Sequence, residues 1–217
     1  TKLFIIYNRK KSNFAIELKF NFILMGTSWL ILGVGNIGQK YHNTRHNIGF
    51  DVVGKLFQKH QTQIKENSLA YYSEIQIRSM KFCCIQPKTF VNLSGQALKF
   101  FSDYFKIPID HTLTIVDDLA LPLDRLRIKT NGSHGGHNGL TNIIDILGHQ
   151  QFPRLRLGIG NNYPFGQQVN YVLGHWSVTE LPIVEKKIDL SIKIIEELPY
   201  LGWEKIMNTY NSFKIKN

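Results

Sequence analysis

The chain has 217 residues with 43% hydrophobic and 19% charged content, which suits one soluble-type globular domain, and no apolar run approaches the roughly 20 residues of a membrane span. Lys and Arg outnumber Asp and Glu by 26 to 16, so the net charge of +10 favours an anionic partner such as nucleic acid, although a general lysine bias explains it equally well. The two cysteines, Cys83 and Cys84, are neighbours, which excludes a disulfide framework and a cysteine zinc site and fits a reducing compartment.

The segment before Met25 differs in composition from the rest of the chain. Residues 1–24 hold five basic residues and one acid, so they carry +4 of the net charge, and they mix these with Phe, Ile and Leu. Three interpretations of the segment are open. It is upstream sequence included by a wrongly assigned start, an organellar targeting peptide, or a real extension of the protein. We favour the first, because it lacks the Ser and Arg richness of a transit peptide and the long apolar stretch of a signal peptide. We therefore expect residues 1–24 to be an extension outside the native fold and residues 25–217 to form the domain.

From Trp29 onward, short apolar runs typical of buried strands alternate with segments that have apolar residues at helical spacing. Strands are expected at 29–34, 71–77, 81–85, 112–116, 125–129 and 155–159, and helices at 48–61, 92–105, 137–147, 180–197 and 203–213. This interleaving predicts an α/β fold: a single domain with a mixed, mostly parallel twisted sheet sandwiched between helices. We find no internal repeat and no internal domain boundary.

Residues 33–38 match G-x-G-x-x-G, the dinucleotide-binding pattern, directly after the first expected strand. In that motif the third glycine opens a helix, and an acid about 20 residues further on ends a second strand. Here a polar run at 39–47 follows Gly38, and Asp51 begins the next helix instead. We therefore interpret these glycines as a tight turn that leaves the sheet.

Polar side chains gather after the strands and at helix starts, where open α/β sheets bind ligands. They are Asn36 with Tyr41 and His46, then Asn92, then Asp117, and a glycine-rich run at 132–139. A hydrolase needs a base of near-neutral pKa, an acid that holds it and donors for a developing oxyanion, which His, Asp and Asn supply. Loops are also rich in Asn and Asp for turn reasons, so this inventory alone leaves both interpretations open. The glycine-rich run suits either an anion-tolerant helix start or a plain flexible loop.

Metal and serine chemistry fit the sequence less well. His42 with His46, and His134 with His137, have helical spacing, yet both pairs lie in Gly- and Asn-rich loops without an intervening carboxylate. We therefore expect no metal. Ser94 lacks the G-x-S-x-G elbow of a nucleophile and is typical of a residue at a helix start.

Six separated motifs resemble those of the bacterial-type peptidyl-tRNA hydrolase family, and the similarity covers nearly all of residues 29–213. They are GVGNIGQKYHNTRHNIGF, QPKTFVNLSGQAL, VDDLALP, RIKTNGSHGGHNGL, FPRLRLGIG and YVLGHWSVTE. The resemblance implies hydrolysis of the ester between tRNA and a peptide or N-blocked aminoacyl group, by activated water, without a covalent intermediate, metal or cofactor. It also implies a cytoplasmic monomer whose partner is peptidyl-tRNA and not a membrane, or an organellar protein if residues 1–24 are a targeting peptide.

The resemblance implies catalytic roles for specific residues. His46 is similar to the general base that activates water, and Asp117 to the acid that orients it and raises its basicity. Asp118 is the alternative acid, and we choose Asp117 because it directly follows the expected strand in the family register. Asn36 resembles the residue that reads the peptide backbone beside the ester.

The resemblance also implies binding roles for six further residues. Asn92 and Asn138 are similar to the amides that hold the 3′ end of the substrate and the water, Tyr41 and Phe90 to the walls around the terminal ribose and adenine, and Lys129 and Arg156 to the basic positions that contact tRNA phosphate.

This chain departs from the family pattern at two positions. It has Ile37 where the family usually has proline, and Val91 where the family usually has methionine. We expect the first change to loosen a loop and the second to shorten one pocket wall, while the catalytic groups remain. A non-catalytic RNA-binding relative, as in some plastid splicing factors of this fold, is the alternative function; the intact set of His, Asp and Asn residues favours the enzyme.

Overall fold

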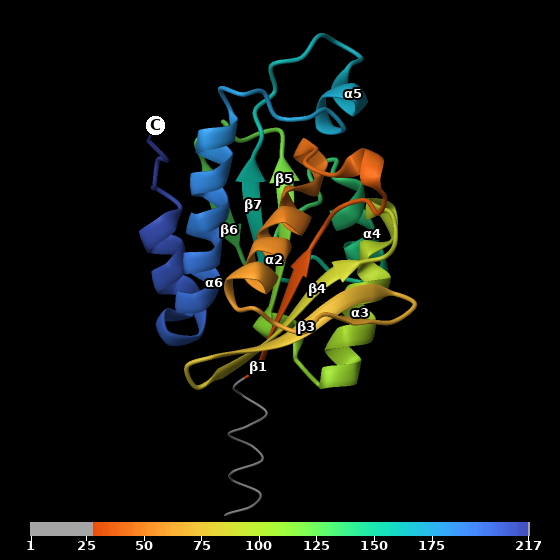
Figure 1. Ribbon diagram of the computed structural model, residues 1–217, viewed down its shortest axis with the longest axis vertical. Helices are drawn as coiled ribbons and strands as arrows, with labels where there is room; N and C mark the ends of the chain where they lie inside the picture. Colours follow the sequence, from red (N-terminus) through yellow and green to blue (C-terminus); the bar gives the residue numbers. More distant parts are fainter. Residues whose placement is uncertain (1–27, 217) are drawn as a thin grey trace, which may run out of the picture.

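The computed structural model describes residues 28–216, which form one sheet between two layers of helices (Figure 1). The strands are β1 (Ser28–Gly33), β2 (Lys65–Glu66), β3 (Ala70–Ile77), β4 (Met80–Pro87), β5 (Thr112–Asp118), β6 (Leu126–Lys129) and β7 (Arg154–Gly158). The expected extension at 1–24 and the proposed start at Met25 lie outside the described residues, so that domain boundary stays a prediction.

The seven strands form a single mixed sheet in the order β2-β3-β4-β1-β5-β7-β6. The inner strands β4, β1, β5 and β7 are parallel, whereas β3 and β6 pair antiparallel with β4 and β7. Since β2 is antiparallel to β3, it shares the direction of the inner strands, so most strands point one way. The prediction of an α/β fold with a mixed, mostly parallel sheet is confirmed. The carboxyl ends of β1, β4 and β5 consequently meet at one edge.

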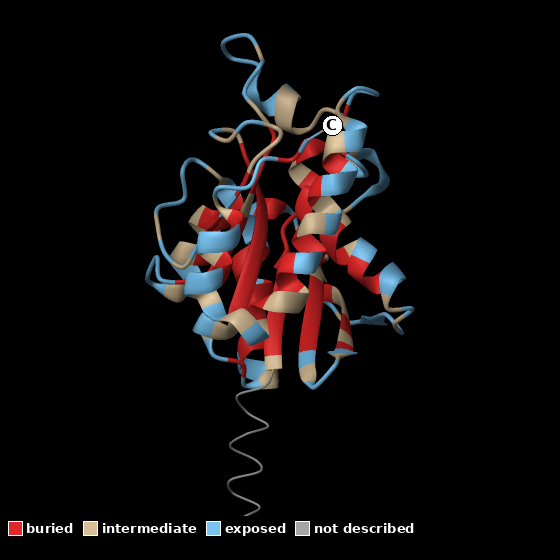
Figure 2. Cartoon of the chain, turned by 90° about the vertical axis from the view of Figure 1, so that its left-hand side faces the viewer, coloured by how far each residue is buried: buried red, intermediate tan, exposed pale blue. Residues whose placement is uncertain are grey.

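Helices cover both faces of the sheet, and Figure 2 shows the buried residues concentrated between the layers. The helices are α2 (Ile48–Lys59), α3 (Ser94–Phe105), α4 (Asn138–Leu147), α5 (Gln168–Val172) and α6 (Leu181–Tyr210). One apolar cluster joins α2 and α6 to the sheet, and the other joins α3 and α4 to its opposite face. Within residues 28–216, no helix is both long enough and apolar enough to cross a membrane.

The C-terminal helix was expected in two pieces, and α6 is indeed interrupted. Gly202 has φ 73° and ψ 167°, a conformation that favours glycine and that breaks the helical path three residues after Pro199. No pattern in the sequence predicted α5 or β2, which are five and two residues long. Elements this short do not show a periodic apolar pattern.

The start of α2 packs directly on the ends of β1 and β5. A Cβ atom at Gly49 would lie 2.5 Å from the carbonyl oxygen of Ile115 and 2.6 Å from the backbone nitrogen of Val34. A Cβ at Gly33 would lie 2.3 Å from the carbonyl oxygen of Gly49. These two glycines therefore allow the helix and the strands to approach closely. The closeness fixes the turn that precedes α2, η2 (Arg45–Asn47), at the carboxyl edge of the sheet.

One lysine of α6 is completely buried against the sheet. Lys187 is 0% exposed, and its ammonium group donates a hydrogen bond to the carbonyl oxygen of Gly158. Burial lowers the pKa of Lys187 to about 7, against the opposing attraction of Asp124 and Glu180. No carboxylate among residues 28–216 forms an ion pair with it.

We expect the substitution Lys187→Met to stabilise the protein near neutral pH. The unfolded lysine titrates near 10.5 and the folded one near 7. The unfolded state therefore binds more protons between these values, and the wild-type stability rises with pH across that window. Methionine has no charge to bury, so the free energy of unfolding at pH 7 should increase by roughly 1–4 kcal/mol.

Urea unfolding between pH 6 and pH 10 measures this effect, with the exposed Lys193→Met as the matched control. The advantage of Lys187→Met should shrink as the pH rises. An advantage that stays constant over the whole range would contradict the buried charge.

Candidate active site

His46 and Asp117 form a hydrogen-bonded pair at the carboxyl edge of the sheet. His46 belongs to η2, and Asp117 is the second-last residue of β5. The distance from His46 Nδ1 to Asp117 Oδ1 is 2.7 Å. The strand was expected to end at Val116, but β5 continues to Asp118, so both acids lie inside it. The side chain of Asp117 is only 3% exposed and that of His46 is 13% exposed. The pair therefore combines a buried acid with an imidazole that solvent reaches.

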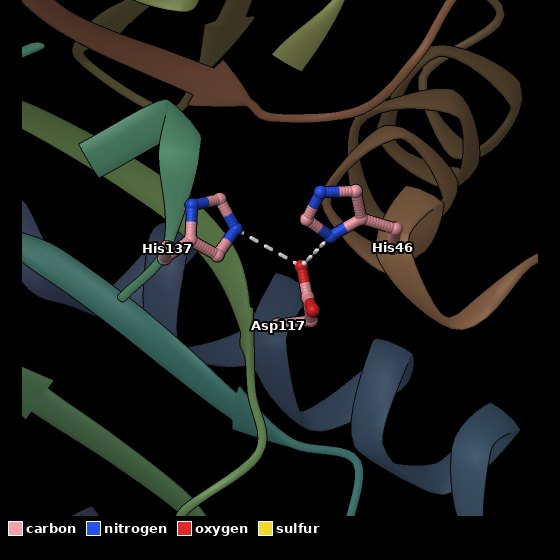
Figure 3. Close-up of side chains that lie close together, drawn as sticks. All are labelled: His46, Asp117 and His137. Carbon is pink, nitrogen blue, oxygen red and sulfur yellow. Dashed lines mark hydrogen bonds and ion pairs between the residues drawn. The ribbon is translucent and has the colours of Figure 1, made fainter. Parts of the chain in front are cut away.

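A second imidazole, that of His137, bonds the same carboxylate oxygen (Figure 3). His137 Nε2 lies 3.0 Å from Asp117 Oδ1. Its Nδ1 caps α4 and accepts hydrogen bonds from the backbone amides of Gly139 and Leu140, at 3.0 and 3.3 Å. An Nδ1 that accepts carries no proton, so Nε2 of this ring carries it and donates to Asp117.

These contacts set the protonation of the centre. Burial raises the pKa of Asp117, but the charges and hydrogen bonds of His46 and His137 outweigh burial and hold that pKa well below its usual range. Burial lowers the pKa of His46, and attraction and hydrogen bonding to Asp117 outweigh this, so the pKa is raised overall. Asp117 is thus an ionised acceptor, to which His46 donates through Nδ1 in either of its protonation states. In the neutral form of His46, the Nε2 atom, which points away from Asp117 in Figure 3, carries no proton and can accept one.

Asn36 links three loops at this edge. Its backbone amide donates to Asn47 Oδ1 at 2.9 Å, and Asn47 Nδ2 donates back to the carbonyl oxygen of Asn36 at 3.0 Å. The side-chain oxygen of Asn36 accepts from the backbone amide of Val91 at 3.0 Å. These bonds join the loop to Asn47 and Val91, and the expectation that Ile37 loosens it stays a prediction. They also leave the side-chain NH₂ group of Asn36 as the donor that is free to face a ligand.

Two aromatic rings and two exposed amides border the pair. The rings of Tyr41 and Phe90 meet edge to face with centroids 6.2 Å apart, and Phe90 is 50% exposed. Asn92 and Asn138 are exposed. Each follows directly in sequence a residue that is bonded into the centre, namely Val91 and His137. Asn92 and Asn138 are therefore next in sequence to residues of the centre, none of the four side chains bonds His46 directly, and their role at the site stays a prediction.

A strip of basic residues lies on the neighbouring strands. Arg127 pairs in register with Arg156, and Lys129 follows Arg127 on the same face of β6. The Arg156 guanidinium forms an ion pair with Asp118, with Nε 2.9 Å from Oδ2. The carboxylate of Asp118 therefore pairs with Arg156, whereas that of Asp117 bonds His46. Lys129 and Arg156 lie on one face of the sheet, and their contact with tRNA phosphate stays a prediction. Arg127, which no sequence pattern indicated, lies beside them.

The buried Arg154 organises the glycine-rich run beside this strip. Its Nη1 donates to the carbonyl oxygens of Gly132 and Ser133 at 2.8 and 3.2 Å, and its Nη2 donates to Gln150 at 2.9 Å. Burial, with the nearby Arg156 charge, lowers the pKa of Arg154 to about 10. The run at 132–139 is therefore an anchored loop and not a plain flexible one.

Arg45, the residue before His46, fastens the segment that carries α5. Its Nη2 contacts both carboxylate oxygens of Glu180, at 2.8 and 3.1 Å, and its Nη1 donates to the carbonyl oxygen of His175 at 2.8 Å. The guanidinium carbon lies 4.4 Å from the ring centroid of Tyr171 and 5.1 Å from that of Trp176. Two nitrogens of the planar group thus bind two different partners while the plane stacks on aromatic rings, which a single ammonium group cannot do.

Fold and site together define an α/β protein with a hydrogen-bonded His–Asp centre of the kind that serves in hydrolysis. The family model described as peptidyl-tRNA hydrolase matches residues 30–217. Peptidyl-tRNA hydrolases of Bacteroides fragilis and Synechocystis are 39% and 42% identical; each alignment covers 84% of this chain, and 98% and 95% of the relative. A solved structure of the Acinetobacter baumannii enzyme superposes with a TM-score of 0.82 at 31% identity, over 88% of this chain and 98% of that one. The chain belongs to the peptidyl-tRNA hydrolase family.

We expect the substitution Arg45→Lys to weaken the attachment of the α5 segment to η2. A single ammonium group cannot bind Glu180 and the carbonyl oxygen of His175 at once or stack on Tyr171, so the free energy of unfolding should fall by roughly 1–3 kcal/mol. A double-mutant cycle with Glu180→Gln should give a coupling energy of roughly 1–3 kcal/mol. Additive effects of the two substitutions would show that the pair does not act as one unit.

Proposed function

We propose that this chain hydrolyses the ester that joins tRNA to a peptide or an N-blocked aminoacyl group, with His46 as the general base. The observation that carries the proposal is the 2.7 Å bond between His46 and a buried, ionised Asp117. Membership of the family, and the names of its relatives, supply the substrate. The activity recycles tRNA from peptidyl-tRNA that has stalled or dropped off during translation.

In the proposed mechanism, His46 Nε2 takes a proton from water while the water oxygen attacks the ester carbonyl carbon. Asp117 stabilises the imidazolium that forms, because its carboxylate already accepts the Nδ1 proton. The bond between the carbonyl carbon and the ribose oxygen then breaks, and His46 returns the proton to that oxygen. The products are a free peptide carboxylic acid and a tRNA with its terminal hydroxyl restored.

Direct attack by water, without a covalent intermediate, fits the groups near His46. The chain's two cysteines lie in the buried strand β4, and burial raises the pKa of both thiols. Ser94 is fully buried, and its hydroxyl donates to the carbonyl oxygen of Val91. Neither of these thiols nor the Ser94 hydroxyl is an available nucleophile.

The surrounding amides supply donors that need no charge. The free NH₂ group of Asn36 suits the carbonyl of the peptide next to the ester. The exposed amides of Asn92 and Asn138 suit the 3′ end of tRNA and the attacking water. The ring pair of the half-buried Tyr41 and the exposed Phe90 offers apolar surface to the terminal ribose and adenine.

The basic strip suits the phosphates of tRNA. Arg127, Lys129 and Arg156 lie on one face and beside the anchored glycine-rich run. Contacts of this kind position an RNA by shape and charge without reading its sequence. We further propose that the protein works as a monomer in a reducing compartment such as the cytoplasm, which fits its two free cysteines.

The geometry of the His46, Asp117 and His137 cluster favours chemistry without a metal. The three potential ligand atoms lie within 4.8 Å of one another. The distances from the two ring nitrogens to Asp117 Oδ1, 2.7 and 3.0 Å, are those of hydrogen bonds. Zinc ligands at 2.0–2.1 Å in a tetrahedral arrangement stand about 3.3 Å apart. In addition, His137 directs a protonated nitrogen at the carboxylate, which a metal ligand does not do.

We expect His46→Ala to lower kcat/KM for N-acetyl-aminoacyl-tRNA by roughly 10²–10⁴-fold, the usual contribution of a general base. Binding of tRNA should persist, and free aminoacyl-tRNA should be largely spared by the wild type. Release of the labelled aminoacyl group measures cleavage, and His134→Ala, in the exposed glycine-rich run, is the matched control. Wild-type RNA binding without ester cleavage would support a non-catalytic RNA-binding protein instead.

We expect Asp117→Asn to change the pH dependence as well as the rate. The base must be neutral, so wild-type kcat/KM falls as the pH drops through the raised pKa of His46. Without the carboxylate that pKa falls, so the acid limb should move to lower pH while the plateau drops by roughly 10²-fold. Measurements between pH 5 and pH 8 separate the two effects. An acid limb that does not move would argue against His46 as the titrating base.

A further inference from the structure

A cleft of about 1000 Å³ begins where the His46 centre ends. Asn36 and Asn47, which form the reciprocal hydrogen bonds beside His46, line its near end. From there the cleft follows α2, between β3 and β4 on one side and the first turns of α6 on the other. The proposed catalytic steps use none of the residues beyond Asn36, so the rest of this cleft has no role in them.

The floor of the cleft is one face of α2. Phe50, Gly54 and Gln58 are each four residues apart, so they lie one above another on that face. At a rise of 1.5 Å per residue this row spans about 12 Å. An extended chain advances about 3.3 Å per residue, so three to four residues fit along it. The ring of Phe50 packs against Gly35, where a Cβ atom would lie 2.6 Å from it, and this contact fixes the floor next to Asn36.

No backbone atom requires a glycine at position 54. A Cβ atom there would meet only Gln86 Nε2, at 3.3 Å, which donates a hydrogen bond to the carbonyl oxygen of Phe50 and would have to shift by a few tenths of an ångström. At Gly33 and Gly49, in contrast, a Cβ would collide with backbone atoms. A glycine inside a helix costs about 1 kcal/mol relative to alanine. The effect of this costly residue is to keep the middle of the cleft open.

The charge of the cleft opposes RNA. Asp51, Glu185 and Asp189 line it together with a single lysine, Lys55, and none of the four forms an ion pair with another residue of 28–216. Burial raises the pKa of Asp51 to about 7, so the excess of negative charge rests mainly on Glu185 and Asp189. The basic strip lies on the other face of the sheet, away from α2 and α6. An excess of acids repels phosphate and tolerates neutral or cationic groups.

We propose that this cleft binds the peptide portion of the substrate, over three to four residues upstream of the one that carries the ester. The inference rests on the proposed function. The peptide passes Asn36, lies extended along the Phe50–Gly54–Gln58 row, and is preferred when its side chains are neutral or basic. Gly54 and the acids of the cleft determine specificity and take no part in the chemical step.

The test compares Gly54→Leu with Gly54→Ala on two substrates, N-acetyl-aminoacyl-tRNA and an uncharged N-acetyl-tetrapeptidyl-tRNA. In the wild type and in Gly54→Ala, kcat/KM for the long substrate should exceed kcat/KM for the short one by roughly tenfold. This ratio corresponds to about 1.4 kcal/mol of additional binding energy from the peptide. Leucine fills the cleft, so Gly54→Leu should lower this ratio to about one. Thermal unfolding checks that both variants fold, which the better helix propensity of leucine and alanine favours.

The proposal would be overturned if Gly54→Leu kept the wild-type ratio of kcat/KM for the long and short substrates, whether both values were unchanged or both fell equally. If the wild type cleaves neither substrate, the proposed function itself fails, and that result is distinguishable from the first two.

A second arm tests the charge of the cleft. Tetrapeptidyl-tRNA with lysine as the third residue from the ester should be cleaved roughly two- to fivefold faster than its glutamate counterpart, the size of effect that exposed charge pairs produce. The double substitution Glu185→Lys with Asp189→Lys should abolish or reverse this preference. Equal rates for the two peptides in the wild type would overturn the assignment of the acids.

Discussion

The buried carboxylate of Asp117 is the constraint on which the rest of the site depends. A carboxylate that is 3% exposed is costly to keep ionised unless donors surround it, and here two imidazoles donate to one of its oxygens. The same bonds fix the orientation of both rings. Because the other nitrogen of His137 caps α4, the position of that helix and of Asn138 at its first turn follows from the same carboxylate. The Asp117 carboxylate thus orients the His46 ring and, through His137, the start of α4 and Asn138.

The sheet topology makes this arrangement available from distant parts of the chain. His46 and Asp117 are 71 residues apart, and Val91, which bonds Asn36, is 55 residues from it. Parallel β1, β4 and β5 end at the same edge, so the loops that follow them meet there. The close approach at Gly49 and the anchoring of Arg45 then reduce the freedom of the turn that carries His46. Preorganisation of this kind is what lets uncharged amides and one base suffice for an ester.

Much of this could be predicted from the sequence, for identifiable reasons. The apolar runs gave the inner strands and therefore the edge at which Asn36, Asn92 and Asp117 gather. What the sequence did not reveal depends on side-chain direction. His137 acts through both ring nitrogens, and histidine is not among the usual residues at a helix N-cap. Arg127 belongs to the basic strip only through its register with Arg156, which no local pattern encodes.

The proposed substrate joins two chemically different halves at one ester, a polyanion and a peptide. The molecule has a matching asymmetry: the basic strip lies on the α3–α4 side of the sheet and the acidic cleft on the α2–α6 side. The His46 centre occupies the edge between them, where the carboxyl ends of the parallel strands face outward. Repulsion between phosphate and the acids of the cleft disfavours the reversed orientation as much as attraction to the strip favours the productive one. The net charge of +10 does not reveal this separation of charge across the sheet, which in the proposed function is what directs the ester toward His46 Nε2.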